Sequence, residues 1–319
     1  MAPDLLVLRE GTEGISTEPY AEALRERLRE HDVRRARTPG EELELIASAP
    51  VATGVRIDEE LLEEAEALEL FCCAFSGVGH LPIEALEARG VTVTNAGGIH
   101  APGLAEQAIG WMLAFARDLH EGYRRQRRRE WRHFQSRELG GSTVTIVGMG
   151  SIGHAVTERL QGFGVETIAV RHSPEKETPT DEVVGYEPEA VHGALARSDY
   201  VVIACPLTET TRGLIGAEAF ATMEPHSVLV NMARGPIVDT DALVTALQKN
   251  AIRGAALDVT DPEPLPEDHP LWTLGNVLIT PHTGGHTPQH WPRLADIVAH
   301  NVRAHEEGNE LRNVVAGGL

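Results

Sequence analysis

Three short stretches of the sequence each carry one residue of a type used in acid–base or anion-binding chemistry. They are NMARGPIVD with Arg234, ALDVTDPEPLP with Glu263, and LITPHTGGHT with His282. Each stretch follows or ends an apolar run that predicts a buried strand. Ligands of doubly wound α/β sheets bind beyond the carboxyl ends of the strands, so we expect the three side chains to converge on one crevice.

An arginine and a histidine together supply what the reduction of a 2-oxo acid requires. The guanidinium of Arg234 can hold the substrate carboxylate, and the imidazole of His282 can donate a proton to the carbonyl oxygen. A carboxylate beside the histidine, here Glu263, would orient the ring and stabilise its protonated form.

A glycine-rich turn lies at residues 143–154, which read TVTIVGMGSIGH. The run VTIV predicts a strand, and Gly148, Gly150 and Gly153 form G-x-G-x-x-G before a helical pattern begins. Gly148 would permit the tight turn, Gly150 the approach of a pyrophosphate, and Gly153 the close packing of helix on strand. Amide groups at the helix N-terminus would bind the phosphates, so the motif predicts a dinucleotide site.

The residue that follows the second strand of such a unit indicates which cofactor is used. The strand ETIAV ends at residue 170, and Arg171 stands eighteen positions after Gly153, where a carboxylate would hold the ribose hydroxyls of NAD. Arginine can instead pair with a 2′-phosphate, and His172 and Ser173 could add donors. We therefore expect NADP(H) to be preferred, with NAD(H) as the alternative if Arg171 only stacks on adenine.

Strand-like and helix-like segments alternate along the 319 residues, which predicts an α/β fold with parallel sheets. A first unit ends near Ala101 and a second opens at STVTIVGMG. Long helical patterns are expected at residues 101–120 and in QHWPRLADIVAHNVRAHEEG near the C-terminus. His286 and His290 would share a helix face, but with no cysteine or carboxylate close by we expect no metal site.

The charge balance is strongly acidic, with a formal net charge of −20. Lys176 and Lys249 are the two lysines, so 26 of the 28 basic residues are arginine. This pattern predicts a solvated acidic surface adapted to high salt, where self-repulsion is screened. The alternative is a GC-rich genome that favours arginine, with ordinary acidity.

The sequence also indicates in which compartment of the cell the protein is located. No apolar run reaches the roughly 18–20 residues of a membrane span, and the N-terminus becomes charged too early for a secretory signal. We therefore expect a cytoplasmic protein. Cys72, Cys73 and Cys205 all lie in apolar runs and are expected to be buried hydrophobic residues.

The motifs taken together resemble the D-2-hydroxyacid dehydrogenase family over nearly the whole chain. They are VGMGSIG, CPLTETTRGLI, NMARGPIVD, ALDV…EPLP and TPH. The resemblance implies an oxidoreductase that reduces 2-oxo acids to D-2-hydroxy acids with hydride from NADPH. It is closest to the 2-ketoacid and glyoxylate–hydroxypyruvate reductases. It also implies that Arg234 binds the substrate carboxylate and carbonyl, that His282 is the general acid, and that Glu263 supports His282.

Further ligand contacts follow from the same resemblance. The loop SGVGH would hold the substrate carboxylate through backbone amides of Gly77 and Val78, together with Arg234 and His282. Asp258 would bind the nicotinamide amide. The residues expected to contact the cofactor are Gly148, Gly150, Ser151, Ile152, Gly153, Arg171, His172, Ser173, Cys205, Pro206, Thr208, Asp258, His282 and Gly284.

The architecture implied by the family is two Rossmann-like domains with a cleft between them that closes as a hinge. Residues 1–101 and 288–319 would form a flavodoxin-like substrate domain, and residues 102–287 the NAD(P)-binding domain. A homodimer is expected, with the basic stretch 124–133 as an arm that pairs with acidic surface of the partner subunit. The overall negative charge argues against nucleic acid as a partner.

Several alternatives remain open within and beyond the family. An NAD-dependent phosphoglycerate-type dehydrogenase is one, and because the sequence ends at Leu319 we expect it to lack a regulatory domain. Formate dehydrogenases of this fold have glutamine where Glu263 stands. A non-enzymatic, nucleotide-sensing corepressor-like protein would keep the same three residues, but the chain shows none of the extra partner-binding segments expected of one.

Overall fold

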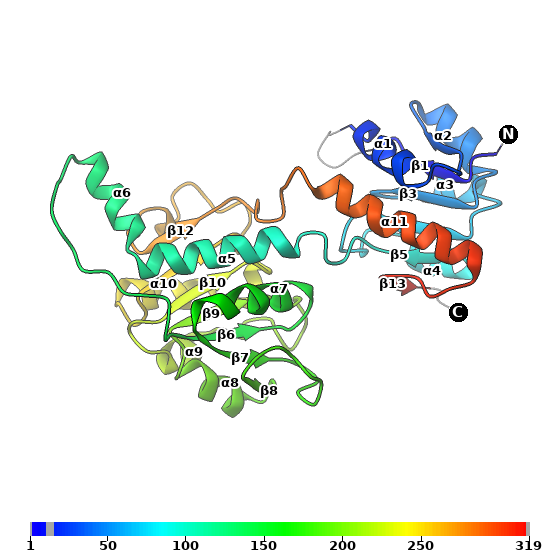
Figure 1. Cartoon of the computed structure of the whole chain (residues 1–319). Coiled ribbons are helices and arrows are strands. Elements are labelled where there is room, and N and C mark those ends of the chain that lie inside the picture. Colours follow the sequence, from blue (N-terminus) through cyan, green and yellow to red (C-terminus); the bar gives the residue numbers. More distant parts are fainter. Residues whose placement is uncertain (1, 11–15, 317–319) are drawn as a thin grey trace. The chain divides into compact units, whose positions relative to one another are not determined.

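The computed structural model describes residues 2–10 and 16–316 and divides the chain into two compact units (Figure 1). The first unit consists of residues 1–99 and 287–319, and the second of residues 100–286. Within the described residues, no helix is both long enough and apolar enough to cross a membrane.

The first unit is built on a six-stranded sheet in the order β13-β5-β4-β3-β1-β2. Five strands are parallel, and β13 pairs antiparallel with β5. The parallel order 2-1-3-4-5 is that of flavodoxin-like domains, as expected. The strands are β1 Leu5–Val7, β2 Val33–Arg35, β3 Val51–Gly54, β4 Leu70–Cys73, β5 Thr92–Thr94 and β13 Val314–Ala316.

Helices cover both faces of this sheet, and each face has its own apolar core. The helix α11 packs against α1 on one face, and apolar side chains of both helices enter that core. The helices are α1 Glu18–Arg27, α2 Pro39–Ile46, α3 Glu59–Glu64, α4 Ile83–Ala88 and α11 His290–Glu307. Because α11 begins at His290, His286 lies outside the helix, and the expected shared helix face of these two histidines is wrong.

The second unit is built on a seven-stranded, fully parallel sheet in the order β12-β11-β10-β9-β6-β7-β8. Counted from β6, this is the 3-2-1-4-5-6 order of Rossmann folds with one strand added. The strand order reverses between β6 and β9, where such sheets bind ligands. The strands are β6 Thr143–Val147, β7 Glu166–Val170, β8 Glu182–Val184, β9 Tyr200–Ile203, β10 Val228–Asn231, β11 Gly254–Leu257 and β12 Val277–Ile279.

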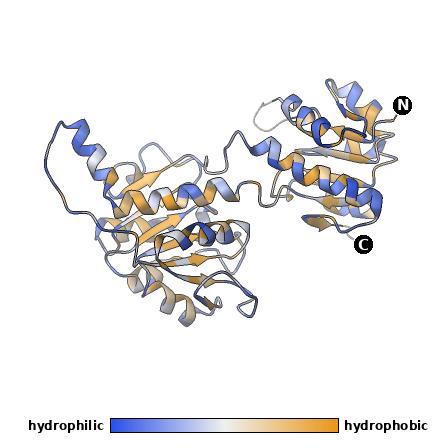
Figure 2. Ribbon diagram, viewed as in Figure 1, coloured by the Kyte–Doolittle hydropathy of each residue, from blue (hydrophilic) through white to orange (hydrophobic). Residues whose placement is uncertain are grey.

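The central strands of this sheet are buried, apart from the first residue of β6, because helices pack on both faces. Figure 2 shows the strands of this sheet mostly in orange, with helices of mixed hydropathy around them. The helices are α5 Ala101–Ala116, α6 Leu119–Arg127, α7 Ser151–Leu160, α8 Pro188–Leu195, α9 Ala217–Thr222 and α10 Thr240–Gln248, with short 3-10 helices η2 Gln161–Phe163, η3 Gly235–Ile237 and η4 Pro270–Trp272. Cys72, Cys73 and Cys205 are buried and free, as expected.

The single helix expected at residues 101–120 is wrong in one respect, because it breaks into α5 and α6. Asp118 adopts a left-handed backbone conformation with φ of 50°. Arg253 stabilises this break, since its guanidinium donates to the carbonyl of Phe115 and to the carboxylate of Asp118. After the break, α6 stands away from the sheet of its unit (Figure 1).

Candidate active site

The three residues singled out for chemistry all follow neighbouring strands of the second unit. Arg234 comes after β10, Glu263 after β11 and His282 after β12, and these strands are adjacent in the sheet. Because the strands are parallel, their carboxyl ends lie along one edge. The loops that carry the three side chains are therefore neighbours.

The side chains of Glu263 and His282 meet directly. The Nδ1 atom of His282 lies 2.6 Å from Oε1 of Glu263. Both side chains are more than 40 % exposed, so the pair contributes little to the stability of the fold. Its effect is on orientation: with Nδ1 engaged by a carboxylate, Nε2 is the nitrogen that can exchange a proton with a ligand.

Asp258 holds the backbone around His282. His282 has a φ of 53°, a conformation that a side-chain-bearing residue seldom adopts without support. Its amide donates to the carbonyl oxygen of Asp258 at 2.8 Å. The amides of Thr283 and Gly284 donate to the buried carboxylate of Asp258 at 3.0 and 2.9 Å. The carboxylate expected to bind nicotinamide thus also shapes the loop of the expected general acid.

Gly235 brings the loop of Arg234 against the loop of Glu263. A Cβ atom on Gly235 would lie 1.9 Å from the carbonyl oxygen of Thr260, so only glycine permits this approach. Thr260 in turn donates its amide to the carboxylate of Glu263 at 3.4 Å. The guanidinium of Arg234 donates to the carbonyl of Ala233, and within the described residues no hydrogen bond or ion pair joins it to Glu263 or His282.

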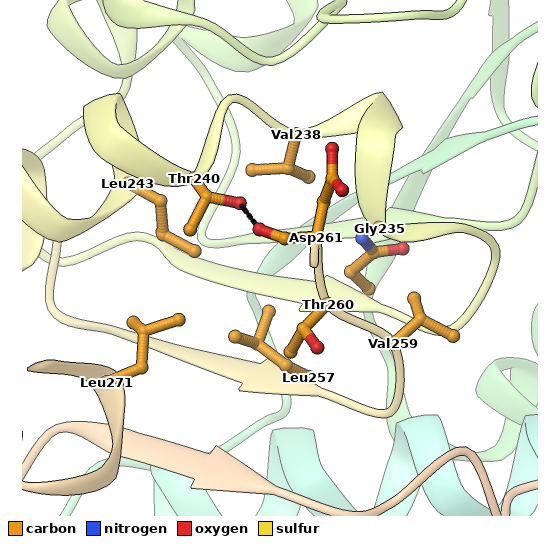
Figure 3. A pocket seen from close by; sticks show the side chains of 10 residues that line it. Gly235, Val238, Thr240, Leu243, Leu257, Val259, Thr260, Asp261 and Leu271 are labelled. Atoms are coloured by element: carbon orange, nitrogen blue, oxygen red, sulfur yellow. Dashed lines mark hydrogen bonds between the residues drawn. The ribbon is translucent and has the colours of Figure 1, made fainter. Parts of the chain in front are cut away.

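A small pocket lies between these two loops (Figure 3). Its apolar lining comes from Val238, Leu243, Leu257, Val259 and Leu271. The hydroxyl of Thr240 donates to the carbonyl of Asp261 at 2.8 Å across its rim, the dashed line in Figure 3. None of the three predicted catalytic residues lines this pocket.

The glycine turn has the geometry of a dinucleotide site. Gly148 has a φ of 102°, and a Cβ atom there would lie 2.5 Å from the amide nitrogen of Cys205. A Cβ atom on Gly153 would lie 2.2 Å from the carbonyl oxygen of Gly148. The Cβ direction of Gly150 is open, with no atom within 4 Å. The open side of Gly150 and the N-terminus of α7, where Ser151 and Ile152 lie, fit a pyrophosphate.

The loop after β7 carries Arg171, His172 and Ser173 on the surface. The backbone of Arg171 is fixed by a hydrogen bond from its amide to the carbonyl of Val184. Its guanidinium lies at 3.5 Å from the carbonyl of Lys176, and no carboxylate follows the strand directly. The structure therefore leaves a half-exposed cation at the position that faces the adenosine ribose in this fold.

The loop after β9 is ordered by a pair of threonines. The amides of Thr208 and Thr211 each donate to the hydroxyl of the other, and the Thr211 hydroxyl donates to the carbonyl of Pro206. Thr211 was not expected from the sequence, since the spacing of two threonines carries no specific signal. Cys205 is buried behind Gly148, and burial raises the pKa of its thiol to about 11. Its side chain packs against the glycine turn.

Gly77 and Val78 belong to the first unit, in the loop between β4 and α4. The hydroxyl of Ser76 donates to the carbonyl of Ala96, and the side chain of Asn95 donates to the carbonyl of Ser76. These bonds anchor the start of the loop, while Gly77 remains exposed. The backbone amides that were expected to bind a carboxylate thus follow the carboxyl end of a central strand.

Comparison with known proteins identifies the family. The model for the NAD-binding domain of D-isomer specific 2-hydroxyacid dehydrogenases matches residues 109–284. A D-3-phosphoglycerate dehydrogenase from Methanocaldococcus jannaschii is 35 % identical over 296 residues, which are 91 % of this chain and 56 % of that protein. A glyoxylate reductase from Pyrococcus furiosus is 35 % identical over 262 residues, which are 79 % of this chain and 77 % of that protein.

Among solved structures, a D-isomer specific 2-hydroxyacid dehydrogenase from Xanthobacter autotrophicus Py2, in complex with NADPH and MES, matches with a TM-score of 0.81. It is 28 % identical, and the match covers 99 % of each chain. The parallel sheet with its glycine turn defines a dinucleotide-binding fold. The chain belongs to the D-isomer specific 2-hydroxyacid dehydrogenase family, whose members are NAD(P)-dependent oxidoreductases that act on CH–OH groups. This confirms the class of enzyme expected from the sequence.

Proposed function

We propose that the protein reduces 2-oxo acids to D-2-hydroxy acids with NADPH, and that His282 is the general acid. The observation that carries this proposal is the 2.6 Å contact between Nδ1 of His282 and Glu263, beside the loop of Arg234. A bound nicotinamide nucleotide would supply the hydride that reduces the carbonyl carbon.

In this proposal His282 donates the proton from Nε2 to the carbonyl oxygen as it becomes a hydroxyl. Glu263 stabilises the protonated ring through Nδ1 and holds it in one orientation. Arg234 binds the substrate carboxylate and carbonyl oxygen, which fixes the face of the carbonyl carbon that is open to reduction. The amides of Gly77 and Val78 bind the same carboxylate.

The roles of the two units follow from these residues. We propose that the first unit, with the C-terminal helix α11, binds the substrate carboxylate and that the second unit binds the nucleotide. Gly150, Ser151 and Ile152 would hold the pyrophosphate at the N-terminus of α7. The loop of Pro206 and Thr208 would border the same site.

Arg171 supports NADPH as the preferred nucleotide. A half-exposed arginine, with His172 and Ser173 next to it, can pair with a 2′-phosphate that NADH lacks. The related structure from Xanthobacter autotrophicus holds NADPH, which agrees with this preference without fixing it for this chain.

We favour glyoxylate or hydroxypyruvate as substrate, given the glyoxylate reductase relatives. A phosphoglycerate-type activity is the second candidate, favoured by the relative from Methanocaldococcus jannaschii.

We also propose that two copies of the chain form a dimer through α6 and the segment that follows it. Trp131 is 96 % exposed and Tyr123 is 66 % exposed, and arginines surround them. Large apolar side chains beside cations suit an acidic partner surface, which a chain of net charge −20 provides. Reversing the charges of Arg127, Arg128 and Arg129 should yield monomers in sedimentation analysis, and an intact dimer would contradict the proposal.

The experiment that tests the main proposal is a rate measurement with a panel of small 2-oxo acids, using NADPH and NADH side by side. Turnover that is faster with NADPH supports both the reaction and the preference. Tight nucleotide binding without turnover would instead favour a nucleotide-sensing binding protein.

A further inference from the structure

Gln107 on α5 is not one of the residues that we assign to substrate, nucleotide or proton transfer. It lies beside the buried apolar residues Leu104 and Ala108, on the side of α5 that meets the loop of His282. Its Nε2 atom donates to the hydroxyl of Thr280 at 2.8 Å and to Oδ1 of Asp258 at 3.3 Å. A polar side chain of one helix thus contacts two residues more than 150 positions further along the chain.

In the hydrogen bonds around Gln107, the donors are Gln107 and Thr280, and the Asp258 carboxylate is the final acceptor. A carboxylate only accepts, so the side chain of Gln107 must turn its NH₂ group toward Asp258. The hydroxyl of Thr280 accepts from Gln107 and donates its own hydrogen to Oδ1 of Asp258 at 2.5 Å. Because Asp258 is only 2 % exposed, each of these bonds acts where water does not compete.

Asp258, which Gln107 and Thr280 hold in place, in turn bonds the backbone of the loop that carries His282. Its carbonyl oxygen accepts from the amide of His282, and its carboxylate accepts from the amides of Thr283 and Gly284. His282 needs this support because its φ of 53° lies in the left-handed region. A rotation of the Asp258 carboxylate would release the amides of Thr283 and Gly284, the two residues that directly follow His282.

We propose that Gln107 is a positioning residue for His282, acting through Thr280 and Asp258. The proposal rests on the proposed function, in which His282 transfers the proton. Gln107 keeps the Asp258 carboxylate in the one orientation that bonds the loop, so the imidazole is placed before the ligands bind.

The substitution Gln107→Leu distinguishes a role in positioning His282 from a role in the stability of the fold. Gln107→Leu keeps the size and the helix propensity of the side chain but removes the donor. We expect kcat to fall about tenfold, as a small displacement of an acid would cause, with little change in KM or in the melting temperature. In the ligand-free protein, the amides of Thr283 and Gly284, which donate to the Asp258 carboxylate, should exchange with deuterium about ten times faster than in the wild type.

Gln107→Glu gives a signature that a merely structural role would not produce. At neutral pH the introduced carboxylate faces that of Asp258 and repels it, so kcat should be low. As the pH falls, the introduced carboxyl group takes up a proton and becomes a donor again, so kcat relative to the wild type should rise. Gln107→Leu should show no such recovery.

Gln248, exposed on α10, provides the matched controls Gln248→Leu and Gln248→Glu, which should leave kcat and exchange unchanged. Unaltered exchange of the Thr283 and Gly284 amides in Gln107→Leu would overturn the inference, as would equal kcat losses in both Gln107 variants at every pH. The exchange result is independent of turnover. A wild type that reduces no 2-oxo acid would therefore refute the proposed function and leave the placement of the loop to be decided by exchange.

Discussion

At the level of single residues, the pairing of Glu263 with His282 was predictable from the sequence. The hydrogen bonds that hold the loop of His282 in place were not. Both paired residues stand in short motifs at strand ends, where catalytic side chains of this fold occur. The hydrogen bonds that hold the loop connect Gln107, Asp258 and Thr280, which belong to separate elements. Periodicity and local spacing carry no information on such contacts, so only the folded chain reveals them.

Replacing Glu263 with glutamine tests the carboxylate beside the imidazole. Glutamine keeps the shape but not the charge that stabilises the protonated ring, so we expect kcat near neutral pH to fall by about 10–100-fold. The melting temperature should hardly change, because the pair is exposed. Steady-state kinetics and thermal unfolding measure both quantities, with the exposed Glu267→Gln as control. Full activity of the Glu263 variant would remove this residue from the account.

Replacing Arg171 with aspartate tests the nucleotide preference. A charge-assisted bond to the 2′-phosphate is lost and repulsion replaces it, while aspartate can bind the ribose hydroxyls of NADH. The ratio of kcat/KM for NADPH to that for NADH should therefore drop at least about tenfold. An unchanged ratio would show that Arg171 stacks on adenine and does not discriminate.

At the scale of elements, the sequence located most strands and the glycine turn, because buried runs and G-x-G-x-x-G are strong local signals. Strands β2, β8 and β13, each three residues long, and helix α2 were not predicted. Thr38 and Pro39 do begin α2 as a cap and first-turn proline. The break after α5 was not predicted either. That break depends on Arg253, a residue 135 positions from Asp118, and no local pattern encodes it.

Two alanine substitutions in the glycine turn should have different effects, one on nucleotide binding alone and the other on the stability of the fold as well. Gly150→Ala adds a methyl group to open space at an ordinary φ of −85°, so the fold should keep its melting temperature. The methyl group would occupy the approach of the pyrophosphate, and the affinity for nucleotide should fall at least about tenfold. Gly153→Ala would set a methyl group 2.2 Å from the Gly148 carbonyl oxygen and should lower the melting temperature as well.

Calorimetry and thermal unfolding of both variants check this contrast between binding and folding. Normal nucleotide affinity in Gly150→Ala would contradict the placement of the pyrophosphate at the N-terminus of α7. A Gly153→Ala variant as stable as the wild type would contradict the close approach of α7 to the turn.

At the scale of the whole molecule, the charge balance is the property most readily obtained from the sequence. With 48 acidic and 28 basic residues, like charges repel over the surface at low ionic strength. We propose that the protein is adapted to high salt and that molar KCl, which shortens the screening length to about 3 Å, stabilises the fold. Thermal unfolding between low and molar KCl should show a rising melting temperature. Equal stability across this range would instead favour a GC-rich genome as the source of the arginines.

We propose above that His282, oriented by Glu263, is the proton donor in the reduction of a 2-oxo acid. The most direct measurement is the initial rate of glyoxylate and hydroxypyruvate reduction with NADPH, for the wild type and His282→Ala, together with nucleotide affinity for both. We expect turnover by the wild type, a loss of at least about 100-fold in kcat for the variant, and retained nucleotide binding. Near-normal turnover by His282→Ala would contradict this proposal.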